Sequence, residues 1–269
     1  MYKLVALDMD GTLLRKDKTI SKRTFDAIQA ARQRGVKVVL ATGRPVMGIE
    51  SYLEYLGLDQ DDEYAITFNG SAVQRGKSGQ MLFEKFMTGE DLHSLYKLSE
   101  KYGLNIHAFD ESGRLITPRP NKFTDIEAEI NKIQVYIEDF STIKDSDQII
   151  KVMIVDEPEK LDLLTKEIPQ EYLSKFSIMR SSDIFLEFVP LGINKSIGLS
   201  VLSEKLNIPR EEIIAVGDAG NDIDMIKYAG LGVAMNNAFP QVKEVADYIT
   251  ASNDDDGVAK VIEKFILAE

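Results

Sequence analysis

Near the start of the chain, residues 3–12 read KLVALDMDGT. The apolar part, residues 3–7, predicts a short strand buried on both faces, as in a parallel sheet. Asp8 and Asp10 follow where that strand ends, and ligands of open parallel sheets bind at the carboxyl ends of the strands. Two carboxylates in one place repel each other unless a cation or a proton compensates. The segment therefore predicts a parallel sheet and a binding site at its carboxyl edge.

Strand and helix patterns alternate outward from this segment. The expected elements are, in order, a strand at 3–7, a helix from Ser21 to Gly35, a strand at 36–41, a helix at 47–56 and a strand at 64–68. The turn signal Asn69-Gly70 closes the last of them. This βαβαβ pattern predicts an α/β fold with right-handed crossovers.

The pattern changes after about residue 84. The expected elements there are a helix at 88–102, short strands at 105–109 and 114–117, a strand at 148–155, a helix at 158–172 and a hairpin at 176–179 and 184–189. Alternation then returns with a helix at 195–206, a strand at 213–216, a helix from Asp222, a strand at 231–235, a helix at 241–246, a strand at 248–250 and a helix from Gly257. We expect one discontinuous domain, residues 1–84 and 190–269, and an inserted α+β domain, residues 85–189.

Three further motifs fall at ends of these elements. Thr42-Gly43-Arg44 follows a strand, and a hydroxyl with free backbone N–H groups suits a phosphate oxygen. Lys195 lies just inside a predicted helix and offers a compact positive charge. Residues 217–222, GDAGND, follow another strand with two carboxylates and an amide. Each motif alone fits a turn or a solvated side chain, but a turn does not explain carboxylates at two strand ends of one sheet.

A calcium-binding EF-hand loop is an alternative interpretation of the first motif. Asp8, Asp10 and Gly11 resemble the start of such a loop. Its twelfth position would be Thr19, where a bidentate Glu is required. The mismatch excludes this interpretation.

Taken together, DMDGT, TGR, the later Lys and GDAGND occur in an order that resembles the haloacid dehalogenase superfamily, its Cof-type hydrolases and, among these, YidA-like sugar phosphatases. The resemblance covers the whole chain and includes the insertion between the second and third motifs. It implies a Rossmann-like parallel-sheet core with an inserted α+β cap domain of the C2 type, which would close over the substrate and select it.

The resemblance also implies residue roles. Asp8 would be the nucleophile that forms an aspartyl-phosphate, and Asp10 would protonate the leaving oxygen and later deprotonate water. The residues implied to bind the phosphate or the substrate are Met9, Thr42, Gly43, Lys195 and Asn221. Those implied to hold Mg²⁺, directly or by supporting its ligands, are Asp8, Asp10, Asp218 and Asp222.

The function expected is Mg²⁺-dependent hydrolysis of small phosphate monoesters, sugar phosphates above all. A phosphosugar mutase would use the same intermediate but needs a cluster of cap arginines for a second phosphate, and Arg114, Arg119 and Arg180 are scattered along the chain. A non-catalytic metabolite sensor is the other alternative. A retired site would be expected to lose Asp8 or Asp10 first, and both are present.

Composition sets broader limits. The 269 residues carry 32 basic and 44 acidic side chains, a net charge of −12, which argues against a nucleic-acid partner. The absence of cysteine excludes disulfides, thiolate metal sites and thiol nucleophiles. No apolar run approaches the roughly 20 residues that span a bilayer, and the N-terminus lacks a signal peptide. We expect a cytoplasmic monomer or homodimer without a membrane partner, whose partner is a small phosphorylated metabolite.

Overall fold

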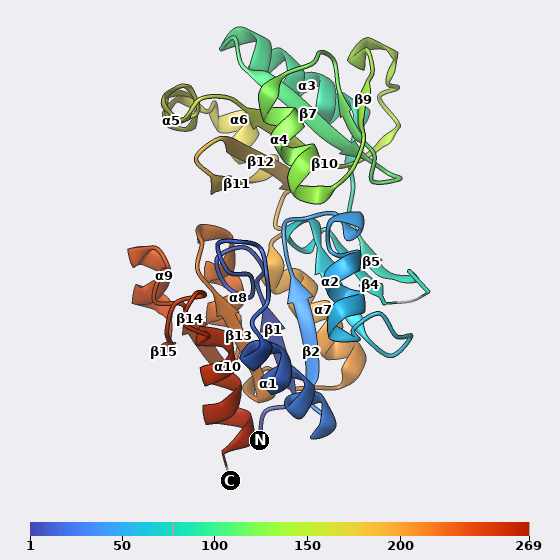
Figure 1. Ribbon diagram of the computed structural model, residues 1–269. Helices are drawn as coiled ribbons and strands as arrows, with labels where there is room; N and C mark the ends of the chain where they lie inside the picture. The colour runs from blue at the N-terminus through green and yellow to red at the C-terminus, as the bar shows by residue number, and fades with distance from the viewer. Residues whose placement is uncertain (77, 269) are drawn as a thin grey trace. The chain divides into compact units, whose positions relative to one another are not determined.

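The computed structural model describes residues 1–76 and 78–268, so residues 77 and 269 of the predicted first domain lie outside the described residues. Figure 1 shows the strands of the chain with helices packed against them. The chain divides into two compact units. The first, here the core unit, comprises Met1–Gly43, Glu50–Glu84 and Asn194–Glu269, and the second, here the inserted unit, comprises Arg44–Ile49 and Lys85–Ile193.

An eight-stranded sheet forms the centre of the core unit, in the order β15-β14-β13-β1-β2-β3-β4-β5. Its strands are β1 (Leu4–Leu7), β2 (Lys37–Ala41), β3 (Tyr64–Thr67), β4 (Ala72–Arg75), β5 (Met81–Glu84), β13 (Ile213–Gly217), β14 (Leu231–Ala234) and β15 (Tyr248–Ile249). All neighbours from β15 to β3 pair in parallel, whereas β4 and β5 are antiparallel. Leu7 of β1 lies opposite Leu40 of β2 and Val216 of β13, so these three strands end at one edge.

Successive side chains of a strand point to opposite sides, and successive residues of the central strands are buried. Both faces of this sheet are therefore covered by helices. The helices of the core unit are α1 (Lys22–Gln33), α2 (Glu50–Leu56), α7 (Lys195–Leu206), α8 (Ile223–Tyr228), α9 (Pro240–Val245) and α10 (Gly257–Ile262), the last followed by a π-helical turn, Glu263–Leu267. One apolar cluster joins Leu4 and Val39 of the sheet to Leu199 of α7 and Met225 of α8. Each such fully buried side chain contributes roughly 1.5–3 kcal/mol.

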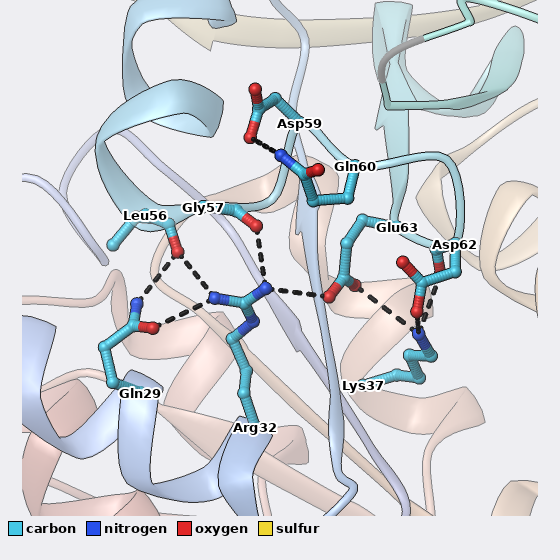
Figure 2. A network of polar contacts seen from close by, with 9 residues as sticks. All are labelled: Gln29, Arg32, Lys37, Leu56, Gly57, Asp59, Gln60, Asp62 and Glu63. Atoms are coloured by element: carbon cyan, nitrogen blue, oxygen red, sulfur yellow. Dashed lines mark hydrogen bonds and ion pairs between the residues drawn. The ribbon is translucent and has the colours of Figure 1, made fainter.

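A polar network fixes the opposite edge of the sheet, where β2 and β3 begin (Figure 2). Arg32 of α1 donates to the carbonyl oxygens of Leu56 (3.0 Å) and Gly57 (2.7 Å), the last residues of α2 and its turn. The same guanidinium lies 3.0 Å from Oε1 of Glu63, which also faces Lys37 at 3.8 Å. Cationic donors suit the unsatisfied carbonyls at a helix C-terminus. This network ties α1, α2 and two strands together away from the predicted site.

A second, mixed sheet forms the inserted unit, in the order β11-β12-β10-β7-β8-β9 with β6 beside β10. Its elements are β6 (Met87–Thr88), α3 (Gly89–Lys101), β7 (Asn105–Asp110), β8 (Leu115–Thr117), α4 (Lys122–Asn131), β9 (Val135–Ile137), β10 (Gln148–Val155), α5 (Pro158–Glu167), α6 (Gln170–Leu173), β11 (Phe176–Ser182) and β12 (Phe185–Pro190). The short 3-10 helices of the chain are Val46–Gly48, Phe68–Gly70, Phe140–Thr142, Arg210–Glu212 and Gly220–Asp222. The prediction of an α/β fold, with a parallel-sheet core and an inserted α+β segment, is confirmed.

The two faces of the inserted sheet differ in chemistry. Val152 and Ile154 of β10 belong to the apolar cluster of this unit, and the alternating residue Lys151 points to the other face. There, its Nζ lies 3.1 Å from Oε2 of Glu187, and the two side chains are only 1% and 4% exposed. His107 is buried beside them with Nδ1 3.0 Å from the hydroxyl of Thr124, and burial, reinforced by the charge of Lys151, lowers the pKa of His107 to about 3.

Two predicted helices are broken in the structure. The helix expected at 47–56 divides into a 3-10 turn, Val46–Gly48, and α2, because Ile49 between them leaves the helical conformation (φ −123°). The helix expected at 158–172 divides into α5 and α6. Pro169 causes this break, since proline lacks an N–H and pushes the preceding residue out of the helical region.

Among residues 1–76 and 78–268, no helix combines the length and the apolar character that a membrane span requires.

Candidate active site

A tight turn places Asp8 at the end of β1. The N–H of Asp8 donates to the carbonyl of Val216 (3.0 Å), which extends the β1–β13 ladder by one residue. The turn then reverses through Gly11, whose φ of +86° disfavours other residues. A Cβ on Gly11 would also overlap the carboxylate of Asp218. This close approach lets the hydroxyl of Thr12 donate to Oδ1 of Asp218 (2.8 Å).

A buried lysine joins the first and last motifs. Lys195 is the first residue of α7, and Asn194 caps that helix by accepting hydrogen bonds from the N–H groups of residues 196 and 197. Its Nζ lies 2.5 Å from Oδ1 of Asp8 and 2.7 Å from Oδ1 of Asp222. The other oxygen of Asp222 accepts the N–H groups of Asp218 (2.9 Å) and Ala219 (3.0 Å). Asp222 therefore orients both the lysine and the loop that carries Asp218.

Negative charge exceeds positive charge in this cluster. Burial, followed by repulsion from Asp222, raises the pKa of Asp8 well above its ordinary value. Burial and the same repulsion raise the pKa of Asp218 to about 6. Burial alone would lower the pKa of Lys195, but attraction to Asp222 and Asp8 outweighs burial and raises it. The protein by itself thus provides one cation for three carboxylates.

The three carboxylates fit a metal ion. Asp8, Asp218 and Asp222 each offer an oxygen, and these atoms lie within 4.8 Å of one another. Hard divalent cations prefer such oxygen ligands, and their charge would offset the repulsion that raises the carboxyl pKa values. Because Asp222 already bonds through both oxygens, Asp8 and Asp218 are the more accessible ligands.

A second group of predicted residues meets around Asn69, at the end of β3. Its N–H donates to the carbonyl of Thr42 (2.9 Å), and its side-chain oxygen accepts from Nδ2 of Asn221 (2.9 Å). Gly43 passes so close that a Cβ there would lie 3.0 Å from Nδ2 of Asn69. Sequence reasoning interpreted Asn69 only as part of a turn. Its position directly after a parallel strand, at the same edge as the other motifs, was the signal that could have identified it.

Met9 and Asp10 lie differently from the other predicted residues. The side chain of Met9 is fully buried in the core, so only its backbone could meet a substrate. The carboxylate of Asp10 is 40% exposed, and its Oδ1 lies 2.7 Å from Nζ of Lys18. Asp10 thus remains open to solvent while Asp8 is buried.

These features define a class of protein. The parallel sheet brings carboxylates that follow β1 and β13 together around a lysine at the start of α7, and a mixed sheet is inserted in the chain. This is the architecture of a haloacid dehalogenase-type hydrolase. Residues 5–262 match the haloacid dehalogenase-like hydrolase family, and the chain belongs to that family.

Several relatives extend over nearly the whole chain. A protein of Streptococcus pyogenes serotype M6 is 39% identical over 98% of both chains. Its name assigns it provisionally as a phosphatase and gives no substrate. The 5-amino-6-(5-phospho-D-ribitylamino)uracil phosphatase YcsE of Bacillus subtilis is 36% identical over 98% of this chain and 96% of its own.

Solved structures share the fold. A haloacid dehalogenase-like hydrolase from Bacteroides thetaiotaomicron superposes with a TM-score of 0.87 at 36% identity and covers 99% of this chain and 100% of its own. The subclass IIB sugar phosphatase BT4131 superposes with a TM-score of 0.83 at 28% identity over 99% of this chain and 100% of its own.

Proposed function

We propose that this hydrolase is a Mg²⁺-dependent phosphatase that acts on small phosphate monoesters, sugar phosphates above all, through an aspartyl-phosphate on Asp8. The observation that carries the proposal is the buried set Asp8–Lys195–Asp222, with Asp218 beside it. Relatives that are phosphatases of a phosphorylated ribityl compound and of sugar phosphates support this substrate class.

In the proposed first step, an oxygen of Asp8 attacks phosphorus while the bond to the leaving oxygen breaks. Lys195 holds Oδ1 of Asp8 at 2.5 Å and so restricts its orientation. A carboxylate nucleophile divides one difficult displacement into two easier ones. Held by Asp8 and Asp218, Mg²⁺ would supply the charge neutralisation that lets a dianionic phosphate approach these carboxylates.

Asp10 is proposed to move the protons. Its carboxyl group would give a proton to the leaving oxygen, and the resulting carboxylate would then take a proton from the water that attacks the aspartyl-phosphate. Partial exposure of Asp10 suits this role, because leaving group and water must both reach it. General acid–base catalysis of this kind contributes about 10²–10⁴ in rate.

The phosphoryl oxygens are proposed to be held by Thr42, the N–H of Gly43 and the amide of Asn221, with Lys195 neutralising their charge. Fixed donors around a transferring phosphoryl group lower the barrier. Asn69 connects three of these residues and would keep their donors in place. The inserted unit is proposed to select the leaving group.

The mutase alternative receives no support from the inserted unit. A second phosphate site would need arginines gathered in one place, whereas the arginines at 114, 119 and 180 bond to different partners. Arg114 pairs with Asp110 at 2.6 Å, Arg119 donates to the carbonyl of Leu104, and Arg180 donates to the carbonyl of Ser182. We therefore propose water as the acceptor.

The test is release of inorganic phosphate from a panel of phosphorylated sugars and small metabolites, with Mg²⁺ and with EDTA. Asp8→Asn, which keeps the shape of the side chain, should abolish release, whereas the exposed control Asp61→Asn should not. Release that survives both EDTA and Asp8→Asn would refute the proposed mechanism. Absence of release from the whole panel by folded wild-type protein would refute the phosphatase.

A further inference from the structure

A tight turn follows the first motif. The N–H of Arg15 donates to the carbonyl of Thr19 (3.0 Å), and the N–H of Lys18 donates back to the carbonyl of Arg15 (2.9 Å). Lys18 has a φ of +62°. This is the left-handed conformation, which favours glycine because glycine has no Cβ. A lysine here has a backbone cost that glycine would avoid.

Contacts from several sides fix this turn. The N–H of Lys16 donates to Oδ1 of Asp254 (3.1 Å), and the guanidinium of Arg15 pairs with Asp256 (2.9 Å). The hydroxyl of Tyr52, on α2, donates to the carbonyl of Lys18 itself (3.2 Å). An unfavourable φ persists when the surroundings determine it and is common at functional sites. These contacts hold the backbone of Lys18 in one place.

From this fixed position, the side chain of Lys18 reaches Asp10. Its Nζ lies 2.7 Å from Oδ1 of Asp10, within hydrogen-bond distance. The other lysine of the turn, Lys16, points elsewhere and pairs with Asp254 at 3.3 Å. Of the two lysines in this turn, only the one in the unfavourable conformation contacts the proposed acid–base residue.

We propose that Lys18 is a positioning residue for Asp10, an inference that rests on the proposed function. When the bond between phosphorus and the leaving oxygen breaks, its electron pair stays on that oxygen, which takes the proton of the Asp10 carboxyl group. Asp10 becomes a carboxylate, and its contact with Lys18 restricts the side chain to one orientation toward the leaving oxygen. Lys18 keeps its own protons throughout.

This role predicts a dependence on the leaving group. An alkoxide is a strong base and must be protonated as it leaves, whereas p-nitrophenolate leaves without a proton. Loss of Lys18 should therefore slow transfer from an alkyl phosphate and spare transfer from p-nitrophenyl phosphate. A general loss of structure would slow both.

The experiment measures single-turnover release of the alcohol, with Mg²⁺, from p-nitrophenyl phosphate and from the sugar phosphate that the wild type hydrolyses fastest. Lys18→Gly suits the test because glycine accepts the positive φ, so the fold should lose no stability. We expect about a tenfold slower release from the sugar phosphate, a fraction of the effect of general acid catalysis, and an unchanged rate with p-nitrophenyl phosphate.

Two variants serve as controls. Lys18→Arg keeps the charge and should retain most of the rate with the sugar phosphate. Lys16→Met removes the neighbouring lysine and should leave both rates unchanged. Equal slowing of both substrates by Lys18→Gly, or no slowing of either, would overturn the role of Lys18. Failure of the wild type to hydrolyse any substrate would instead overturn the proposed function, so the two failures are distinguishable.

Discussion

Lys195 and Asp222 form an ion pair that solvent does not reach: Nζ and Oδ1 are 2.7 Å apart, and both side chains are 0% exposed. The same Nζ lies 2.5 Å from Asp8. A charge this deeply buried is tolerated only when it is paired and hydrogen-bonded. The lysine is therefore a structural requirement of the site as well as a candidate for phosphate binding.

Replacement of Lys195 should destabilise the protein. Lys195→Met leaves two buried carboxylates without their cation, and removal of one partner of a buried pair costs about 3–5 kcal/mol. Urea unfolding in EDTA would measure the loss. The exposed residue Lys205, at the end of the same helix, provides the control Lys205→Met, which should change stability little. Equal stability of the two variants would contradict the prediction.

Mg²⁺ should stabilise the folded protein through Asp218. A ligand that binds only the folded state adds about 2.7 kcal/mol at a hundredfold excess over its dissociation constant. Thermal unfolding with and without Mg²⁺ should show a higher Tm with the metal. Asp218→Asn should remove most of this shift, and Asp61→Asn should retain it. A full shift in Asp218→Asn would place the metal elsewhere.

The metal-free protein should show an unusual pH dependence. The pKa of Asp218 is about 6 in the folded protein, above its ordinary value of 3.8, so the folded state binds this proton more tightly. The contribution of Asp218 to stability is therefore full below about pH 4 and is lost as pH rises through 6, by roughly 3 kcal/mol at most. Asp8 shifts in the same direction.

The comparison of wild type with Asp218→Asn tests this effect, because carboxyl groups outside the cluster titrate alike in both, and loss of the repulsion from Asp218 lowers the pKa of Asp8 in the variant. Urea unfolding in EDTA at pH 4 and pH 7 gives the free energies. Stability of the variant relative to the wild type should rise between these pH values. A constant difference would show that the pKa of Asp218 is ordinary.

Asn69 should matter for phosphate binding. Asn69→Ala loses the amide that bonds Asn221 and also the tolerance of asparagine for a φ of +55°. Asn69→Gly removes the whole side chain but adds no backbone strain, since glycine accepts this φ. Both variants should bind inorganic phosphate about tenfold more weakly as a competitive inhibitor, the effect of about 1.4 kcal/mol. Unchanged inhibition of Asn69→Gly would limit Asn69 to a backbone role.

The buried ion pair of Lys151 and Glu187 in the inserted unit allows a test of how such a pair contributes to protein stability. Lys151→Met leaves Glu187 buried without its cation and should cost about 3–5 kcal/mol, whereas the double variant Lys151→Met/Glu187→Leu should approach wild-type stability. Urea unfolding of the three proteins would show the order. A double variant less stable than the single one would mean that other partners depend on Glu187.

Elements with strong local signals were predicted well from the sequence. β10 spans residues 148–155 and α7 spans 195–206, as the long apolar run and the capped helix indicated. The meeting of Asp8 and Asp218 was predictable for a related reason. Motifs after parallel strands meet at one edge, so Asp8 and Asp218 could be placed together without knowledge of packing.

Features that depend on tertiary contacts were not predictable in this way. β4 and β5 form the antiparallel end of the sheet, where polar residues such as Gln74 interrupt the apolar pattern. Asn69 looked like a turn because its partners, Thr42 and Asn221, are distant in the sequence. The contact of Lys18 with Asp10 depends on a backbone conformation that sequence propensity assigns to glycine.

The pairing of β1 with β13 also sets the order in which parts of the protein can fold during synthesis. Leu7 and its partner Val216 are separated by most of the chain. At about 5–20 residues per second, a ribosome adds the intervening residues in roughly 10–40 s. Lys195 is added only near the end of that time and Asp222 after it, so until then Asp8 lacks both partners. The inserted unit can fold while synthesis continues, and the nucleophile becomes buried only among the last events of biogenesis.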